Sequence, residues 1–167
     1  MNRIVTEFLD FARPQVVQYQ PVALEKLLEK ILQFLEPEIQ KQGVTATKSF
    51  SPLAQPLSAD PDLLYRAFLN ILLNALQAMP GGGTLSLAVR HYPQEVEVEI
   101  SDTGSGLSPE ALEKAFDPFF TTKEKGSGLG LAIVRNTIEA HEGRISLEPG
   151  AHGGVAVRIV LPRGTIG

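Results

Sequence analysis

The chain has 167 residues, 43% of them hydrophobic and 20% charged, so it can bury the core of one domain and is not compositionally disordered. Its 15 Lys and Arg against 19 Asp and Glu give a net charge of −4, which argues against a general binder of nucleic acid or anionic membranes. The absence of Cys excludes disulfides, thiol catalysis and Cys-ligated metal sites. The charged N-terminus is not typical of a signal peptide and no apolar run could span a bilayer, so a cytoplasmic location is expected.

The first 43 residues predict two helical segments separated by prolines. An apolar pattern at helical spacing in residues 1–14 ends at Pro14, and a segment this short cannot bury its apolar face alone. Residues 1–14 are therefore expected to be the end of a longer helix, and 15–167 a domain that follows it. Pro21 is expected to open a second helix with a leucine-rich stripe, which Gly43 ends.

The remaining sequence alternates between strand and helix patterns. The segments expected to form strands are 44–50, 55–59, 84–91, 95–101, 144–148 and 155–161. The segments expected to form helices are 61–79, 108–116 and 127–141. Helices and a mostly antiparallel sheet in this order predict an α/β (α+β) two-layer sandwich.

The predicted helix 61–79 is apolar almost all round, which indicates burial on most sides. Its polar exceptions include Asp62, Arg66, Asn70 and Asn74, which are each four residues apart and so form one stripe. A solvated helix face favours Lys and Glu, whereas Asn is a poor helix former. The two Asn residues therefore indicate amides that bind a ligand; a solvated face is the alternative.

Two glycine-rich segments and the residues between them suggest a nucleotide site. Residues 102–106, Asp-Thr-Gly-Ser-Gly, are typical of a turn when taken alone, but a carboxylate there could also accept a hydrogen bond from an exocyclic amine such as that of adenine. Residues 126–130 precede a helix, where backbone N–H groups bind phosphate. Residues 116–123 supply aromatic, hydroxyl and cationic groups typical of a hinged lid. Neither a Rossmann fingerprint nor a P-loop is present.

In this order the motifs resemble those of the catalytic ATP-binding domain of sensor histidine kinases, whose fold is shared with DNA gyrase, heat-shock chaperone ATPases and mismatch-repair ATPases. The matching segments are 70–75 for the N box, 102–106 and 126–132 for the two glycine boxes, and 116–123 for the F box. The wording PFFTTK and LNALQAM is most similar to the nitrogen-regulation type of kinase. The resemblance implies a mixed five-stranded sheet backed by about three helices, with ATP held between the sheet and a lid.

Carried over by position, the resemblance implies ATP and Mg²⁺ as cofactors. Asn74 would bind the Mg²⁺, Asp102 would bind the adenine amine, and Asn70, Asn74 and Lys123 would be the catalytic residues. The residues implied to contact the nucleotide are Asn70, Asn74, Asp102, Gly104, Gly106, Thr122, Lys123, Gly126, Ser127, Gly128, Leu129 and Gly130.

The chain departs from the related families at three positions of the central helix. Gln77 and Ala78 stand where kinases of the family often carry a basic residue and an aromatic one. Asn70 stands where the ATPases and serine kinases of this fold have a Glu that activates water or a hydroxyl. Because an amide cannot accept a proton at neutral pH, the chain is expected to bind ATP but to hydrolyse it poorly.

The family's phosphate acceptor is a His on a separate dimerisation helix. None of His91, His141 and His152 lies in a comparable motif, and each is expected in a surface or capping role. The implied partners are the dimerisation and phosphoacceptor domain of the same full-length kinase and the receiver domain of a response regulator, with no nucleic acid. The chain itself is expected to be monomeric and the full-length kinase a homodimer; membrane anchoring of the full-length kinase is left open. The alternatives are a stand-alone regulatory serine kinase or ATPase of the same fold, and an ATP-sensing interaction module.

Overall fold

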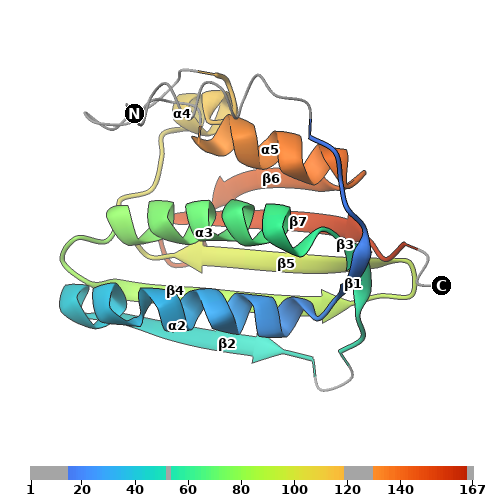
Figure 1. Ribbon diagram of the computed structural model, residues 1–167. Helices are drawn as coiled ribbons and strands as arrows, with labels where there is room; N and C mark the ends of the chain where they lie inside the picture. Colours follow the sequence, from blue (N-terminus) through green and yellow to red (C-terminus); the bar gives the residue numbers. More distant parts are fainter. Residues whose placement is uncertain (1–14, 52–53, 119–129, 165–167) are drawn as a thin grey trace, which may run out of the picture.

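The computed structural model describes residues 15–51, 54–118 and 130–164. In these residues one layer is a β-sheet, and helices cover one of its two faces (Figure 1). The elements in chain order are β1 (Gln20–Val22), α2 (Leu24–Gln42), β2 (Val44–Phe50), β3 (Leu57–Ala59), α3 (Pro61–Gln77), β4 (Gly83–His91), β5 (Glu95–Asp102), α4 (Pro109–Lys114), α5 (Gly130–Ala140), β6 (Arg144–Pro149) and β7 (Val155–Pro162).

The main sheet has five strands in the order β2-β4-β5-β7-β6. Only β2 and β4 are parallel; the other neighbouring pairs are antiparallel. The expected mixed, mostly antiparallel five-stranded sheet and the two-layer sandwich are therefore confirmed. A separate pair, β1 with β3, closes the end of the domain where the chain enters α2 and α3.

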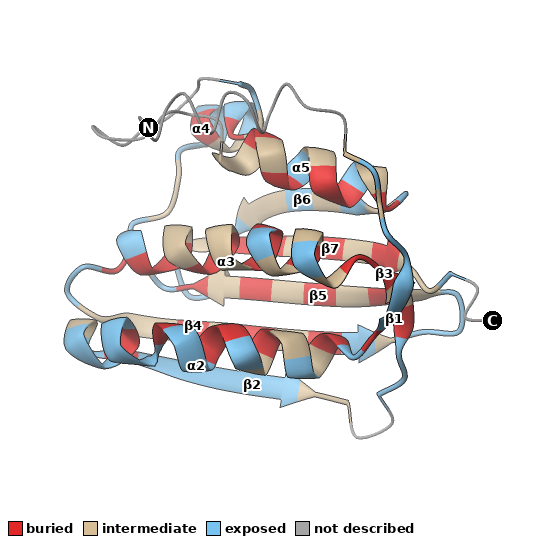
Figure 2. Cartoon of the chain, viewed as in Figure 1, coloured by how far each residue is buried: buried red, intermediate tan, exposed pale blue. Residues whose placement is uncertain are grey.

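Alternation along the strands separates the two faces of the sheet. On β5, Val96, Val98 and Ile100 are buried against the helices, while Glu97 and Glu99 between them face away (Figure 2). The helix layer supplies the matching apolar side chains, of which Phe68 on α3 is fully buried. Burying an apolar side chain of this size stabilises the fold by roughly 1.5–3 kcal/mol.

Pro21 does not open a helix, contrary to the expectation from sequence. It lies in β1 opposite Ser58 of β3, and α2 begins only at Leu24. A proline is tolerated in so short a peripheral strand because its missing N–H removes no ladder bond from the interior of a sheet. In the part of the chain that the structure describes, no helix combines the length and apolar character needed to cross a membrane.

A buried polar cluster joins the start of α3 to the end of α5. His141 is 3% exposed; its Nδ1 lies 2.8 Å from the carbonyl oxygen of Thr137, and its Nε2 lies 3.0 Å from the backbone N of Asp60. Because a carbonyl only accepts and an amide N–H only donates, Nδ1 donates to Thr137 and Nε2 accepts from Asp60. His141 thus bonds a carbonyl at the end of α5, which fits the expected capping role, although it is buried.

The same cluster holds the segment that precedes β1. The hydroxyl of Thr137 donates to Oε1 of Gln15 at 2.8 Å, and the backbone N–H of Gln18 donates to Oδ2 of Asp60 at 2.9 Å.

His91, which was expected at the surface or in a cap, is instead largely buried, with its Nε2 2.5 Å from Oε2 of Glu25.

Asp60 is a predicted hot spot of stability because it performs two tasks at once. Its Oδ1 accepts from the backbone N–H groups of Asp62 and Leu63, which caps α3, while Oδ2 holds Gln18. We expect Asp60→Ala to lower the free energy of unfolding by about 2 kcal/mol, measured by urea denaturation. Asp62→Ala, which removes an exposed carboxylate of the same first turn, is the control and should change it little; equal losses in the two variants would contradict this role of the cap.

Candidate nucleotide site

The polar stripe of α3 runs from solvent into a covered region. Asp62 and Arg66 are exposed, whereas Asn70 and Asn74 are half-buried. The change follows from the packing of α5 beside α3, because Nδ2 of Asn70 donates to the carbonyl oxygen of Gly130, the first residue of α5, at 3.2 Å. The two amides are therefore not part of a freely solvated helix face.

Gly130 allows this close approach between the two helices. A Cβ at this position would lie 3.2 Å from both Nδ2 and Oδ1 of Asn70, which is tighter than most real contacts. The end of the second glycine-rich segment thus lies against the first Asn of the N-box pattern, as a shared binding site requires. The predicted nucleotide contacts Thr122, Lys123, Gly126, Ser127, Gly128 and Leu129 lie outside the described residues.

Asp102 is the last residue of β5, and its side chain is buried. It is 8% exposed, and its Oδ1 accepts from the backbone N–H of Gly104 at 2.9 Å. Burial raises the pKa of this carboxyl above its ordinary value of 3.8, and hydrogen bonds from the backbone of Gly104 and Val155 oppose that rise in part. A buried carboxylate with so few partners is a strong acceptor for a polar group of a ligand.

The turn after Asp102 packs on the C-terminal end of α3. The backbone N–H of Ser105 donates to the carbonyl oxygen of Ala78 at 3.2 Å. A Cβ on Gly104 would lie only 2.3 Å from that oxygen, so no larger residue fits without movement of the backbone. Gly106 has φ +73°, a conformation that favours glycine. Ala78, the position that departs from the kinase pattern, therefore supports the glycine-rich turn directly through its backbone.

The described part of the site is thus one surface with two ends. Asn70 and Gly130 lie at one end, and Asp102, Gly104 and Ala78 lie at the other. The eight helical steps from Asn70 to Ala78 rise about 12 Å, so this part of the chain spans a distance comparable with that between the base and the phosphates of a nucleotide.

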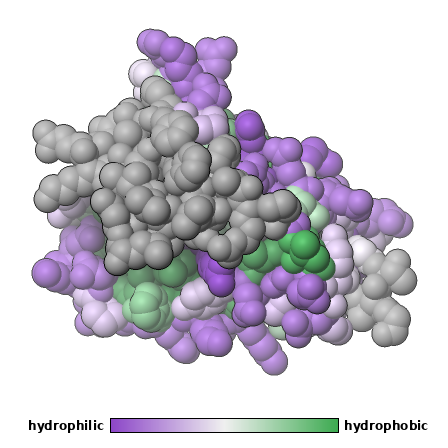
Figure 3. Space-filling view, turned by 45° about the horizontal axis from the view of Figure 1, so that its top comes forward, coloured by the Kyte–Doolittle hydropathy of each residue, from purple (hydrophilic) through white to green (hydrophobic). Residues whose placement is uncertain are grey.

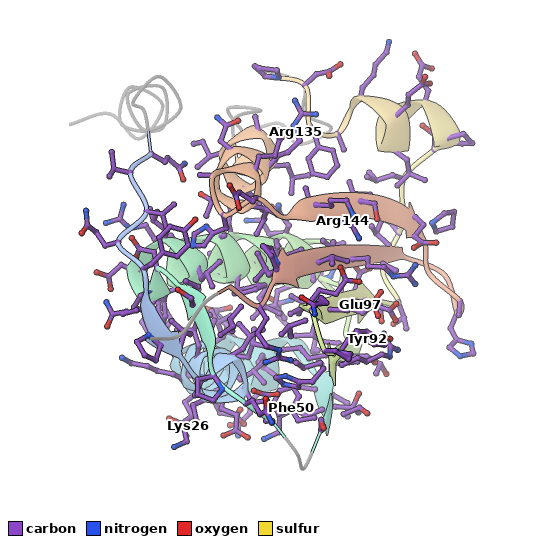
Figure 4. All side chains as sticks on the ribbon, turned by 90° about the vertical axis from the view of Figure 1, so that its right-hand side faces the viewer. Lys26, Phe50, Tyr92, Glu97, Arg135 and Arg144 are labelled. Carbon is purple, nitrogen blue, oxygen red and sulfur yellow. The ribbon has the colours of Figure 1, made fainter. Side chains whose placement is uncertain are left out.

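Arg135 contacts the start of the F-box segment, which the sequence pattern did not indicate. The guanidinium of Arg135 on α5 (Figure 4) lies 5.6 Å from the ring centroid of Phe116, which follows α4. Cation–π contacts of this kind contribute roughly 0.5–1 kcal/mol at exposed sites. The position of Arg135 in the helical pattern of α5 predicts that its side chain is exposed. It does not predict which residue that side chain contacts.

A hollow of about 460 Å³ lies elsewhere, on the outer face of the sheet. Its lining includes Tyr92, Glu97 and Arg144, which Figure 4 labels, and Arg158. The charges there already satisfy one another: Arg158 lies 2.9 Å from Glu99 and 3.1 Å from Glu97, and the bond to Glu99 raises the pKa of its guanidinium further. This hollow is therefore a weaker candidate site than the buried, charged end of β5.

The surface seen in Figure 3 is mostly hydrophilic, with smaller hydrophobic areas beside the region that is not described.

The sequence that forms this site matches a known protein family. Residues 59–165 match the family of histidine kinase-, DNA gyrase B- and HSP90-like ATPases. The chain belongs to this family. Within the ATPase family, the match covers α3, Asp102, α5 and the strands that carry the candidate site.

The chain is similar to sensor kinases along almost all of its length. It is 36% identical over 163 residues to the sensor histidine kinase ZraS of Klebsiella oxytoca, covering 97% of this chain and 35% of ZraS. It is also 36% identical over 167 residues to the signal transduction histidine-protein kinase AtoS of Escherichia coli (strain K12), covering 97% of this chain and 27% of AtoS. The chain therefore spans about a third or less of the length of these relatives.

Solved structures of histidine kinases have a fold similar to that of this chain. The nucleotide-free catalytic domain of histidine kinase ThkA has a TM-score of 0.81 and 27% identity, covering 87% of this chain and 98% of that domain. Full-length ShkA in complex with AMPPNP has a TM-score of 0.86 and 26% identity over 98% of this chain and 36% of ShkA. ThkA in complex with the response regulator TrrA has a TM-score of 0.85 and 26% identity over 96% of this chain and 46% of that one.

A role of Asp102 as an acceptor for the nucleotide, together with its raised pKa, predicts that nucleotide binding depends on pH. Protonation converts the carboxylate into a poorer acceptor for an amine, so ATP affinity should be full above the raised pKa and fall as the pH is lowered through it. Asp102→Asn has no proton to titrate and should bind weakly without this step. Calorimetry of both proteins across acidic pH tests this, since the ratio of their affinities cancels titration of the nucleotide phosphates; parallel profiles would contradict it.

The contribution of Asp102 to the free energy of unfolding, measured without nucleotide, should fall as the pH rises, whereas the ATP affinity should increase. Because the folded pKa of Asp102 is the higher one, this group stabilises the fold below pH 3.8, and its contribution is lost as the pH rises through the raised value.

Proposed function

We propose that this chain is the catalytic ATP-binding domain of a sensor histidine kinase. In this proposal it holds Mg·ATP and donates the γ-phosphoryl group to a His on a dimerisation domain, from which the phosphate passes to an Asp of a response regulator. The observation that carries the proposal is the buried Asp102 carboxylate, held beside glycine-rich turns at one end of α3, with half-buried amides further along the same helix. The similarity to ZraS, AtoS and the catalytic domain of ThkA supports it.

Asp102 would read the base. A buried carboxylate accepts a hydrogen bond from the exocyclic amine of adenine, whereas guanine presents a carbonyl there and would be repelled. Gly104 and Gly106 would let the ring approach the backbone. Glycine at 104 is already required by Ala78, so no side chain at this position can block the base.

The donor set fits Mg²⁺ that is held largely by the nucleotide. In residues 15–51, 54–118 and 130–164, no group of three or more His, Asp or Glu is placed to hold a metal by itself. Mg²⁺ prefers oxygen ligands and keeps waters and phosphates in its octahedral shell, so a single amide oxygen from α3 suffices. Asn74 would supply it, with Asn70 beside it; bound there, the ion would neutralise charge on the phosphates.

The remaining contacts belong to the proposal by position. Thr122, Lys123 and the backbone of Gly126, Ser127, Gly128, Leu129 and Gly130 would bind the phosphates. Lys123 would stabilise the charge that develops on the transferred group, and Asn70 would help to orient it. Asn70 cannot take a proton from water, so the chain would position ATP for a nucleophile on another domain rather than hydrolyse it.

The wider assembly follows from the same proposal. Residues 1–14 would be the end of the dimerisation helix and 15–167 the catalytic domain, monomeric by itself and part of a homodimeric kinase in the cytoplasm. The complex of ThkA with the response regulator TrrA supports a receiver domain as the downstream partner. A serine kinase or ATP-sensing module of the same fold is the competing function.

The Mg²⁺ assignment predicts the behaviour of two substitutions on α3. Asn74→Leu should weaken Mg·ATP binding about tenfold or more and affect metal-free ATP binding much less, because it removes the proposed metal ligand. Arg66→Leu, two turns earlier on the exposed part of the stripe, is the control and should leave the magnesium dependence unchanged. Titrations with and without Mg²⁺ measure both; an unaltered magnesium dependence in Asn74→Leu would remove it from the site.

Phosphoryl transfer tests the function itself. Incubated with radiolabelled ATP, the chain alone should acquire no label, whereas a dimerisation domain with its acceptor His should acquire acid-labile phosphohistidine when both are present. Asp102→Ala in this chain is the control and should abolish the label. Acid-stable label on Ser, or label on the isolated chain, would favour the serine kinase, and no label despite bound ATP would favour the sensing module.

A further inference from the structure

The turn between β6 and β7 lies against the carboxylate of Asp102. It runs from Gly150 to Gly154 and is closed by a hydrogen bond from the backbone N–H of Gly150 to the carbonyl oxygen of Gly154 at 3.1 Å. Two successive residues, Gly153 and Gly154, have φ of +87° and +70°, a region that other residues rarely adopt. The two glycines therefore allow a turn conformation that other residues would adopt only with strain.

Gly154 is in close contact with Asp102, and Gly153 is not. A Cβ built on Gly154 would lie 2.1 Å from the carbonyl oxygen of Asp102 and 2.5 Å from its Oδ1. A Cβ built on Gly153 would meet nothing within 4 Å. Both glycines have a positive φ, but only at Gly154 would a side chain occupy the space that the Asp102 carboxylate fills.

The next residue supplies a donor to the same carboxylate. The backbone N–H of Val155 hydrogen-bonds Asp102, as that of Gly104 does from the other side. Val155 is the first residue of β7, and the register of β5 with β7 places Ser101 opposite Ala156, so Asp102 faces the end of the turn. Two backbone donors from different loops thus fix the direction of one buried side chain.

We infer that Gly154 and the N–H of Val155 position Asp102 for base recognition, which makes the β6–β7 turn a specificity element of the nucleotide site. Neither residue needs to touch the nucleotide; both act through the carboxylate. Gly154 also lies against the glycine-rich turn, since a Cβ on Gly106 would be 3.4 Å from its carbonyl oxygen. This inference rests on the proposed function, because it names what orients the residue that would read adenine.

The matched pair Gly154→Ala and Gly153→Ala tests the inference. Both substitutions place an L-residue at a positive φ, so both should lower the melting temperature, Gly154→Ala by more because its Cβ also meets the backbone of Asp102. Only Gly154→Ala displaces Asp102, so it alone should weaken ATP binding, by roughly tenfold or more, and reduce the preference for ATP over GTP. Calorimetry with ATP and GTP at a temperature where circular dichroism shows all proteins folded gives both affinities.

Val155→Pro provides a second test that does not depend on the folding of Gly154→Ala. It removes the N–H donor at the first residue of a strand, where proline is tolerated, and should also reduce the preference for ATP. Unchanged selectivity in Gly154→Ala and Val155→Pro, or an equal loss in Gly153→Ala, would overturn the inference. If the unsubstituted chain showed no preference for ATP, the proposed function itself would fail instead.

Discussion

The structure depends on the burial of α3 on three sides. In the view of Figure 1 the sheet lies behind α3, with α2 along one flank and α5 along the other. The apolar side chains of α3 are part of the core that these elements bury. A helix enclosed in this way can present polar groups only along the one stripe that its neighbours leave partly exposed. Asn70 and Asn74 occupy that stripe, so the packing that forms the core also selects the residues able to meet a ligand.

At the other end of the site, burial of the Asp102 carboxylate costs the fold free energy. Asp102 ends a strand whose inward residues are apolar, and burial disfavours its ionised form. Backbone donors from Gly104 and Val155 offset part of that penalty without adding a positive charge that would neutralise the carboxylate. On the outer face of the sheet, by contrast, carboxylates such as Glu97 form ion pairs with Arg158 that link neighbouring strands. The carboxylate at the end of β5 is buried without a cationic partner among the described residues, so it is available to a ligand.

Much of this could be predicted from the sequence because the signals were local. The alternation in β5, the cap at Asp60 and the four-residue spacing of Asn70 and Asn74 each follow from periodicity or from turn chemistry. Pro21 was misjudged because its strand exists only through pairing with β3, which is distant in sequence. The contact of Gly154 with Asp102 could not be predicted for the same reason: a glycine pair indicates a turn, not what the turn touches.

The central claim is that the ligand binds between α3 and the turn after β5, not in the hollow on the outer face. An NMR titration of the ¹⁵N-labelled chain with Mg·ATP tests it most directly, because each backbone amide reports its own surroundings. The account predicts the largest shifts in residues 102–106, in Val155 and in the C-terminal half of α3, with none for Arg144 or Arg158. Shifts concentrated on the outer face, or none near Asp102 at saturating nucleotide, would contradict it.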